Sequence, residues 1–144
     1  MERESSWILY NPYFLGCHQD ADHARFINRR GSVSGIINTL LGVAVLHKVY
    51  IRPDIASDPT DGEIRCMYKD VKKNKAIQRY MQDLSINTDA PTIHWEDNRS
   101  CISVVEAKIV TPRVKHIDIP VFFLLEQFYN GLFVPKYEKS SVMP

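Results

Sequence analysis

The sequence predicts a mixed α/β domain in which helices pack on a single sheet. Two apolar, β-branched runs, residues 34–41 and 43–50, are joined by a glycine and are typical of a β-hairpin. Residues 60–84 carry apolar side chains at the i, i+3, i+4, i+7 spacing of an amphipathic helix. Strand-like segments at 13–20 and 92–97 precede and follow these elements. Strands and helices therefore interleave along the chain, which is typical of α/β domains.

The first strand and the long helix have recognisable ends. The strand begins with apolar Phe14 and Leu15 and reaches polar residues at Gln19. Thr60 and Glu63 have the spacing of a capping box at the start of the helix. The helix then spaces its apolar residues as Ile64, Met67, Tyr68, Val71, Ile77, Tyr80, Met81 and Leu84. We expect the last three of these in the core, and we expect the intervening polar segment 72–75 in solvent.

The strand at 92–97 ends in two acids. Alternation along this strand predicts that Trp95 belongs to the core. The same alternation puts Glu96 on the strand face opposite to Asp97, so we expect Glu96 to be exposed.

Three shorter elements follow. Residues 98–105 predict a short helix, and another helix is expected within 116–129, with Pro120 in its first turn. Asn130 and the glycine after it are a typical helix C-cap. A last strand is expected at 132–137, which completes a sheet of about five strands.

Composition limits the classes of protein that this chain can belong to. It has 144 residues, 44% hydrophobic and 24% charged, which is typical of one globular domain. No apolar run reaches about 18 residues, and the acidic, polar start is unlike a signal peptide, so we expect no membrane partner. Cys17, Cys66 and Cys101 lack metal-site spacing, so we expect reduced, buried thiols and an intracellular location, cytoplasmic or nuclear. We also expect no small-molecule cofactor.

The net charge of +1 gives no overall field that would attract a polyanion, so any such partner needs a local basic patch. Two groups of basic residues could supply one. They are Arg29, Arg30, Lys48 and Arg52 near the hairpin, and Lys69, Lys72, Lys73, Lys75 and Arg79 on the long helix. Either group could contact nucleic-acid phosphates, or could be an ordinary solvated surface.

Three acids occupy the expected element ends. Asp20 ends the first strand, Glu63 lies in the first turn of the long helix, and Asp97 ends the strand after it. Strand ends and helix starts meet at one edge of an α/β sheet, and carboxylates gathered there favour a hard cation such as Mg²⁺. The pattern alone is weak, because the chain has 17 acids. The alternative is that Asp20 caps a turn, Glu63 caps its helix and Asp97 is solvated.

Five short segments stand out: Phe-Leu-Gly-Cys-His-Gln-Asp-Ala-Asp at 14–22, Arg-Arg-Gly-Ser-Val-Ser-Gly at 29–35, Thr-Asp-Gly-Glu at 60–63, Asp-Asn-Arg-Ser-Cys-Ile at 97–102 and Lys-His-Ile-Asp-Ile at 115–119. Together they resemble the ribonuclease H domain of copia-type retrotransposon Pol polyproteins. They match its characteristic segments in the family's order, over about residues 13–143. The segment 115–119, Lys-His-Ile-Asp-Ile, matches the family pattern as it stands.

The resemblance implies an RNase H-like fold and hydrolysis of the RNA strand in RNA–DNA hybrids. It implies that Asp20, Glu63 and Asp97 are catalytic acids that bind two Mg²⁺ or Mn²⁺ ions. Arg29, Arg30 and Asn98 are the residues that we expect to contact nucleic acid. The expected partners are the hybrid and other parts of a Pol polyprotein, and an integrase-like member of the superfamily fits the five segments less well.

The sequence departs from the family pattern at its end. No acid after the last strand matches the family's fourth, which opens a C-terminal helix. We therefore expect a leader at 1–12 and an RNase H-like domain at 13–144 whose final helix is missing and whose apolar surface is exposed in consequence. Weakened activity is expected from the loss of the fourth acid. The alternative is a catalytically inactive relic that acts at most as a nucleic-acid-binding or interaction module.

Overall fold

The computed structural model describes residues 15–22, 32–52, 59–86, 88–107, 118–139 and 141, but not the side chains of 20–22, 32, 52 and 118. Three features of the sequence lie outside this part: the expected leader at 1–12, the two arginines at 29 and 30, and residues 115–117 of the Lys-His-Ile-Asp-Ile segment.

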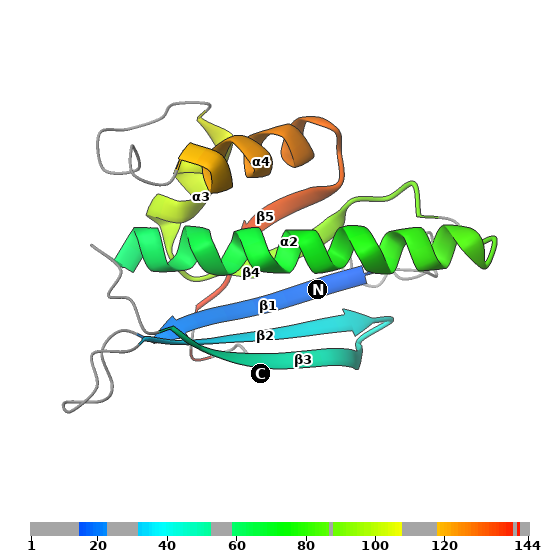
Figure 1. Ribbon diagram of the computed structural model, residues 1–144, viewed down its shortest axis with the longest axis horizontal. Helices are drawn as coiled ribbons and strands as arrows, with labels where there is room; N and C mark the ends of the chain where they lie inside the picture. Colours follow the sequence, from blue (N-terminus) through cyan, green and yellow to red (C-terminus); the bar gives the residue numbers. More distant parts are fainter. Residues whose placement is uncertain are drawn as a thin grey trace, which may run out of the picture.

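The sheet has five strands in the order β3-β2-β1-β4-β5, as Figure 1 shows. The first three strands are antiparallel neighbours, and β4 and β5 run parallel to β1 and to each other. This mixed sheet with helices packed on it confirms the predicted fold class. The strands are β1 (Leu15–Asp22), β2 (Ser32–Leu40), β3 (Val43–Arg52), β4 (Thr92–Glu96) and β5 (Phe133–Tyr137).

Three helices cover the sheet in the described part. The long helix α2 (Pro59–Asp83) lies along β1 and β2, and α3 (Arg99–Glu106) and α4 (Asp118–Tyr129) pack on the β5 side of it (Figure 1). Asn98 caps α3, because its Oδ1 accepts hydrogen bonds from the backbone N–H groups of Ser100 and Cys101. No helix in the described ranges is long and apolar enough to cross a membrane.

The main core lies between α2, α3, α4 and β5. Fully buried Met67 of α2 and Phe133 of β5 belong to it, and the remaining members are Ile64, Val71, Cys101, Val104, Val105, Val121 and Leu124. A smaller cluster joins Cys17, Ile36 and Cys66 between α2 and the hairpin strands. All three cysteines are buried and free, which agrees with the predicted reduced thiols.

Two of the expected core residues on α2 are exposed. Met81 is buried, but Tyr80 is 69% exposed and Leu84 is 72% exposed. The buried face of this end of the helix runs instead through Asn74, Gln78 and Met81, which are three and four residues apart. Asn74, expected in solvent, is fully buried. The prediction was wrong because polar side chains occupy the buried face here.

The prediction for β4 was also wrong. His94 is fully buried under α2, whereas Trp95 is only half-buried and stacks on His18 at 6.1 Å between ring centroids. Thr92, His94 and Glu96 form the buried face of the strand. The polar side chains therefore face the core, and the apolar side chains that were expected there lie on the other face.

The edge strand β3 presents an apolar face to solvent. Val43, Val45, Val49 and Ile51 are each more than half exposed. Val49 and Ile51 are level with Gly35 and Val33 of β2 and project to the same side of the sheet. A register shift between Asn38 and Thr39 separates them from Val43 and Val45.

Candidate metal and nucleic-acid site

Two of the three predicted acids lie together. Glu63 lies in the second turn of α2, and Asp97 directly follows the last residue of β4. Glu63, Asp97 and the adjacent Glu96 each offer a carboxylate oxygen, and these oxygens all lie within 4.8 Å of one another. Glu63 and Glu96 are buried, and Asp97 is half-buried. We call these three residues the carboxylate cluster.

The backbone of Asp20 lies near this cluster. In the parallel pairing of β1 with β4, Cys17 is level with His94 and His18 with Trp95. Continuing that register by two residues brings Asp20 level with Asp97. The side chain of Asp20 lies outside the described residues, so its part in the site stays a prediction.

Sequence reasoning missed Glu96 and expected it to be exposed, yet it is fully buried. The side-chain amide of Gln19 donates a hydrogen bond to Glu96 Oε2, and the backbone N–H of Asn98 donates to Oε1 at 2.9 Å. Burial raises the pKa of Glu96 to about 7, and these two hydrogen bonds oppose the rise while nearby Asp97 adds to it. The signal available in the sequence was the polar series Thr92, His94, Glu96 at every second position.

Three carboxylates this close repel one another when ionised, and a divalent cation relieves that repulsion. Oxygen-only donors are the set that Mg²⁺ and Mn²⁺ prefer. Two of the three carboxylates are buried, so a cation here would be partly shielded from water. The residues present therefore fit a hard divalent ion.

A second group of titratable side chains lies deeper under α2. Atoms of Cys17, Asp70 and His94 also lie within 4.8 Å of one another, and all three residues are fully buried. Hydrogen bonds already engage this group: Asn38 Nδ2 donates to Asp70 Oδ1 at 3.1 Å, and Asn74 Nδ2 contacts His94 Nε2 at 2.6 Å. We describe these five residues as the core polar network, which links β1, β2 and β4 to α2.

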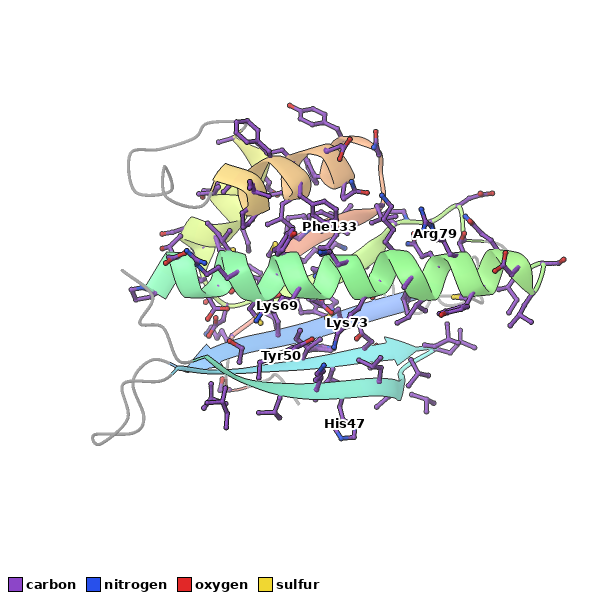
Figure 2. The ribbon with its side chains drawn as sticks, viewed as in Figure 1. His47, Tyr50, Lys69, Lys73, Arg79 and Phe133 are labelled. Carbon is purple, nitrogen blue, oxygen red and sulfur yellow. The ribbon has the colours of Figure 1, made fainter. Side chains whose placement is uncertain are left out.

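Basic side chains gather around Tyr50 on β3. Lys48, Lys69 and Lys73 each place Nζ at 4.7 or 4.8 Å from the centroid of the Tyr50 ring. Figure 2 shows Lys69 and Lys73 on α2 above Tyr50. We call these four residues the Tyr50 lysine cluster.

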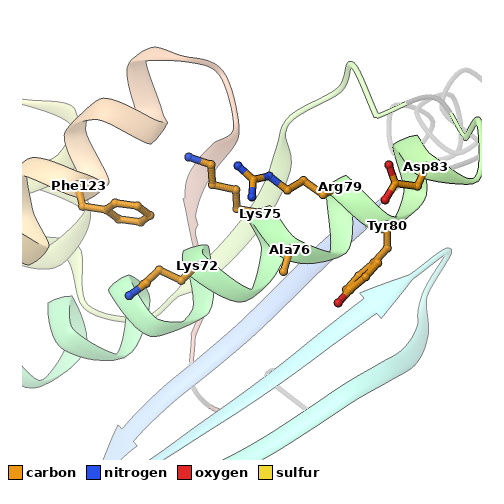
Figure 3. A pocket seen from close by; sticks show the side chains of 7 residues that line it. All are labelled: Lys72, Lys75, Ala76, Arg79, Tyr80, Asp83 and Phe123. Carbon is orange, nitrogen blue, oxygen red and sulfur yellow. The ribbon is translucent and has the colours of Figure 1, made fainter.

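The remaining basic residues of α2 lie around a different feature. Lys72, Lys75 and Arg79 line a hollow of about 360 Å³ with Ala76, Tyr80, Asp83 and Phe123, shown in Figure 3. Arg79 lies 16 residues beyond Glu63 on the same helix, so about 24 Å separates them along its axis. The basic face expected for α2 is therefore two separate surfaces, and the hollow is remote from the carboxylate cluster.

Of the three residues predicted to contact nucleic acid, the structure describes only Asn98. Asn98 directly follows the carboxylate cluster, and its Oδ1 is engaged in capping α3. Arg29 and Arg30 lie outside the described residues. A contact between any of these three and nucleic acid stays a prediction.

Solved structures of RNase H1 proteins are similar to this chain. LC11-RNase H1, isolated from compost by a metagenomic approach, superposes with a TM-score of 0.65 at 9% sequence identity, over 90% of this chain and 86% of that one. The structure of the same protein in complex with an RNA/DNA hybrid superposes with a TM-score of 0.61 at 9% sequence identity, over 88% of this chain and 86% of that one. RNase H1 of the halophilic archaeon Halobacterium salinarum NRC-1 superposes with a TM-score of 0.58 at 12% sequence identity, over 88% of this chain and 86% of that one.

No family model matches the sequence. The copia-type origin therefore stays a prediction that rests on the five sequence segments. At these identities the structural likenesses establish the fold alone, and they agree with the strand order and helix placement above: the chain has an RNase H-like fold.

Proposed function

We propose that this chain is a metal-dependent ribonuclease that hydrolyses the RNA strand of RNA–DNA hybrids. The carboxylate cluster carries the proposal, because it gathers Glu63 and Asp97 within 4.8 Å at one edge of an RNase H-like sheet. The likeness to an RNase H1 solved with an RNA/DNA hybrid supports the class of substrate.

Asp20, Glu63 and Asp97 would hold two Mg²⁺ or Mn²⁺ ions. When bound, such ions supply an activated water and stabilise the charge that develops at the scissile phosphate. The roles of the protein groups follow from their surroundings. Glu63 is carried by a long helix and Asp97 by the end of a buried strand, so both carboxylates are held on rigid elements.

Glu96 has a different role in this proposal. With a pKa of about 7 it is partly protonated at neutral pH, so it lowers the negative charge of the cluster when no cation is present. Its hydrogen bonds from Gln19 and from the backbone of Asn98 fix its position between β1 and α3. Glu96 is therefore a positioning residue that orients the segment bearing Asp97.

We also propose that the chain derives from a copia-type Pol polyprotein, whose other parts would be its protein partners. The five resembling segments support this origin. With three acids matched to the family's four, the 144-residue chain is expected to cleave slowly.

The decisive experiment incubates the purified chain with a hybrid labelled on each strand, in Mg²⁺ and separately in Mn²⁺. We expect cleavage of the RNA strand only, and its loss in Asp97→Asn and Glu63→Gln. Asp83→Asn is the matched control, since this exposed acid lies at the far end of α2. No cleavage by the parent chain, or equal cleavage by Asp97→Asn, contradicts the proposal and favours the inactive relic.

A further inference from the structure

The Tyr50 lysine cluster brings three cationic groups from two elements to one point. Lys48 comes from β3, and Lys69 and Lys73 come from successive turns of α2. Each Nζ lies within 4.8 Å of the ring centroid, so any two ammonium groups are at most 9.6 Å apart. That separation is close to the Debye length of about 8 Å at physiological salt, so the three charges act together on an anion.

The ring does not neutralise these charges. A cation–π contact at an exposed site contributes only about 0.5–1 kcal/mol and leaves the full positive charge in place. Within the described ranges, none of the three lysines forms an ion pair with a carboxylate. The cluster is therefore a concentration of positive charge without a protein counter-ion in the part of the chain that the structure describes.

The position of the cluster relates it to the carboxylate cluster. Tyr50 is level with Ser34 on β2, and Ser34 is level with Ala21, the residue after Asp20 on β1. Two strand spacings of about 4.8 Å separate Tyr50 from β1. Along α2, Lys69 and Lys73 lie six and ten residues beyond Glu63, about 9 and 15 Å along the helix axis.

We infer that the Tyr50 lysine cluster binds backbone phosphates of the RNA–DNA hybrid beside the carboxylate cluster. The inference rests on the proposed function for the identity of the polyanion. A phosphate that neutralises clustered lysines releases its condensed counter-ions, which is the main source of salt-dependent affinity for nucleic acids. The cluster also gives the chain a local basic patch, which its net charge of +1 requires for a polyanion partner.

The arrangement of lysines on α2 supplies a matched control. Lys69 and Lys73 lie over Tyr50, whereas Lys72 and Lys75 line the hollow beside Phe123 (Figures 2 and 3). The double variants Lys69→Gln/Lys73→Gln and Lys72→Gln/Lys75→Gln remove the same charge from the same helix. A thermal denaturation curve for each verifies that both remain folded.

The test measures binding of a short hybrid in the Asp97→Asn background, so that cleavage does not enter. We expect Lys69→Gln/Lys73→Gln to weaken binding about tenfold at low salt and to lower the slope of log K against log salt by about 2. The Lys72→Gln/Lys75→Gln variant should leave both quantities unchanged. Single-stranded RNA, duplex DNA and an acidic peptide are the competing ligands.

Each outcome separates this inference from the proposed function. Equal losses in the two double variants overturn the inference, because charge alone then accounts for binding. Tight binding that neither double variant affects overturns it as well, while the proposed nuclease stands. Preference for the acidic peptide over the hybrid also overturns it. Failure of the parent chain to cleave, with binding still dependent on Lys69 and Lys73, removes the nuclease and leaves the phosphate site.

Discussion

Gln19 of β1 donates a hydrogen bond to the buried carboxylate of Glu96 on β4, directly beside two of the three residues that were predicted to bind metal. Asp20 follows Gln19 and Asp97 follows Glu96 in the sequence. The hydrogen bond therefore fixes the register of the two strands at the point where the acids emerge. It also gives Glu96 a partner in a place where an unpaired carboxylate would be costly.

Glu96 makes stability depend on pH. Burial raises its pKa from 4.5 to about 7, so between these values the folded chain holds a proton that the unfolded chain releases. Stability must then fall as pH rises from about 4.5 to about 7, by up to about 3 kcal/mol. Urea unfolding in chelator at pH 5 and pH 8 measures the difference.

The Glu96→Gln variant should lose this pH dependence, since its amide does not titrate. Glu106→Gln, at an exposed position of α3, is the control and should keep it. A parent chain that is equally stable at both pH values, or a Glu96→Gln variant that retains the fall, contradicts the assignment.

Glu63 should be required for metal-dependent activity. Replacing it with Gln removes one anionic ligand with little change of shape, so we expect cleavage to fall by about 100-fold. Raising Mg²⁺ or Mn²⁺ should recover part of the rate, because a weakened site fills at higher ion concentration. Cleavage rates measured over a range of ion concentrations report this recovery. A variant as active as the parent at every concentration would exclude Glu63 as a ligand.

We expect the core polar network to contribute measurably to the free energy of unfolding. His94 Nδ1 lies 3.1 Å from Asp70 Oδ2, and both side chains are fully buried. His94→Leu would leave the Asp70 carboxylate buried without that partner, and leaving a buried polar group unsatisfied typically costs about 1–3 kcal/mol. His47→Leu, at an exposed position of β3, should cost almost nothing. Guanidinium unfolding of both variants measures the contrast, and similar losses would show that the network adds no stability.

The order of the elements was predictable because each element has its own periodicity. The hairpin, the long helix and the last strand were all predicted close to their observed bounds, and Glu63 with Asp97 emerged at element ends. The errors fall in one place. Asp70, Asn74 and Gln78 of α2 face Thr92, His94 and Asn38 of the sheet, so polar side chains of one element satisfy those of another.

Such pairing cannot be read from the hydropathy of one segment. Polar residues at i and i+4 on a helix indicate solvent when the segment is considered alone, and so do polar residues at alternate positions of a strand. Only contact between α2 and the sheet makes both faces internal. The burial of Asn74 and the exposure of Tyr80 follow from that pairing. Glu96 is buried instead with hydrogen bonds from Gln19 of β1 and from the backbone of Asn98.

The uncovered face of β3 should make the 144-residue chain associate with itself. β3 is at the edge of the sheet, and Val49 and Ile51 are 66% and 73% exposed on it. Edge strands with apolar faces favour pairing between molecules, and a lysine on such a strand opposes it. We expect light scattering to rise with protein concentration for the parent and to rise much less for Val49→Lys. Tyr80→Lys, at an equally exposed apolar side chain on α2, tests whether the location matters. If Tyr80→Lys suppresses association as strongly as Val49→Lys, the β3 face is not the surface responsible, since added charge alone would then account for the effect.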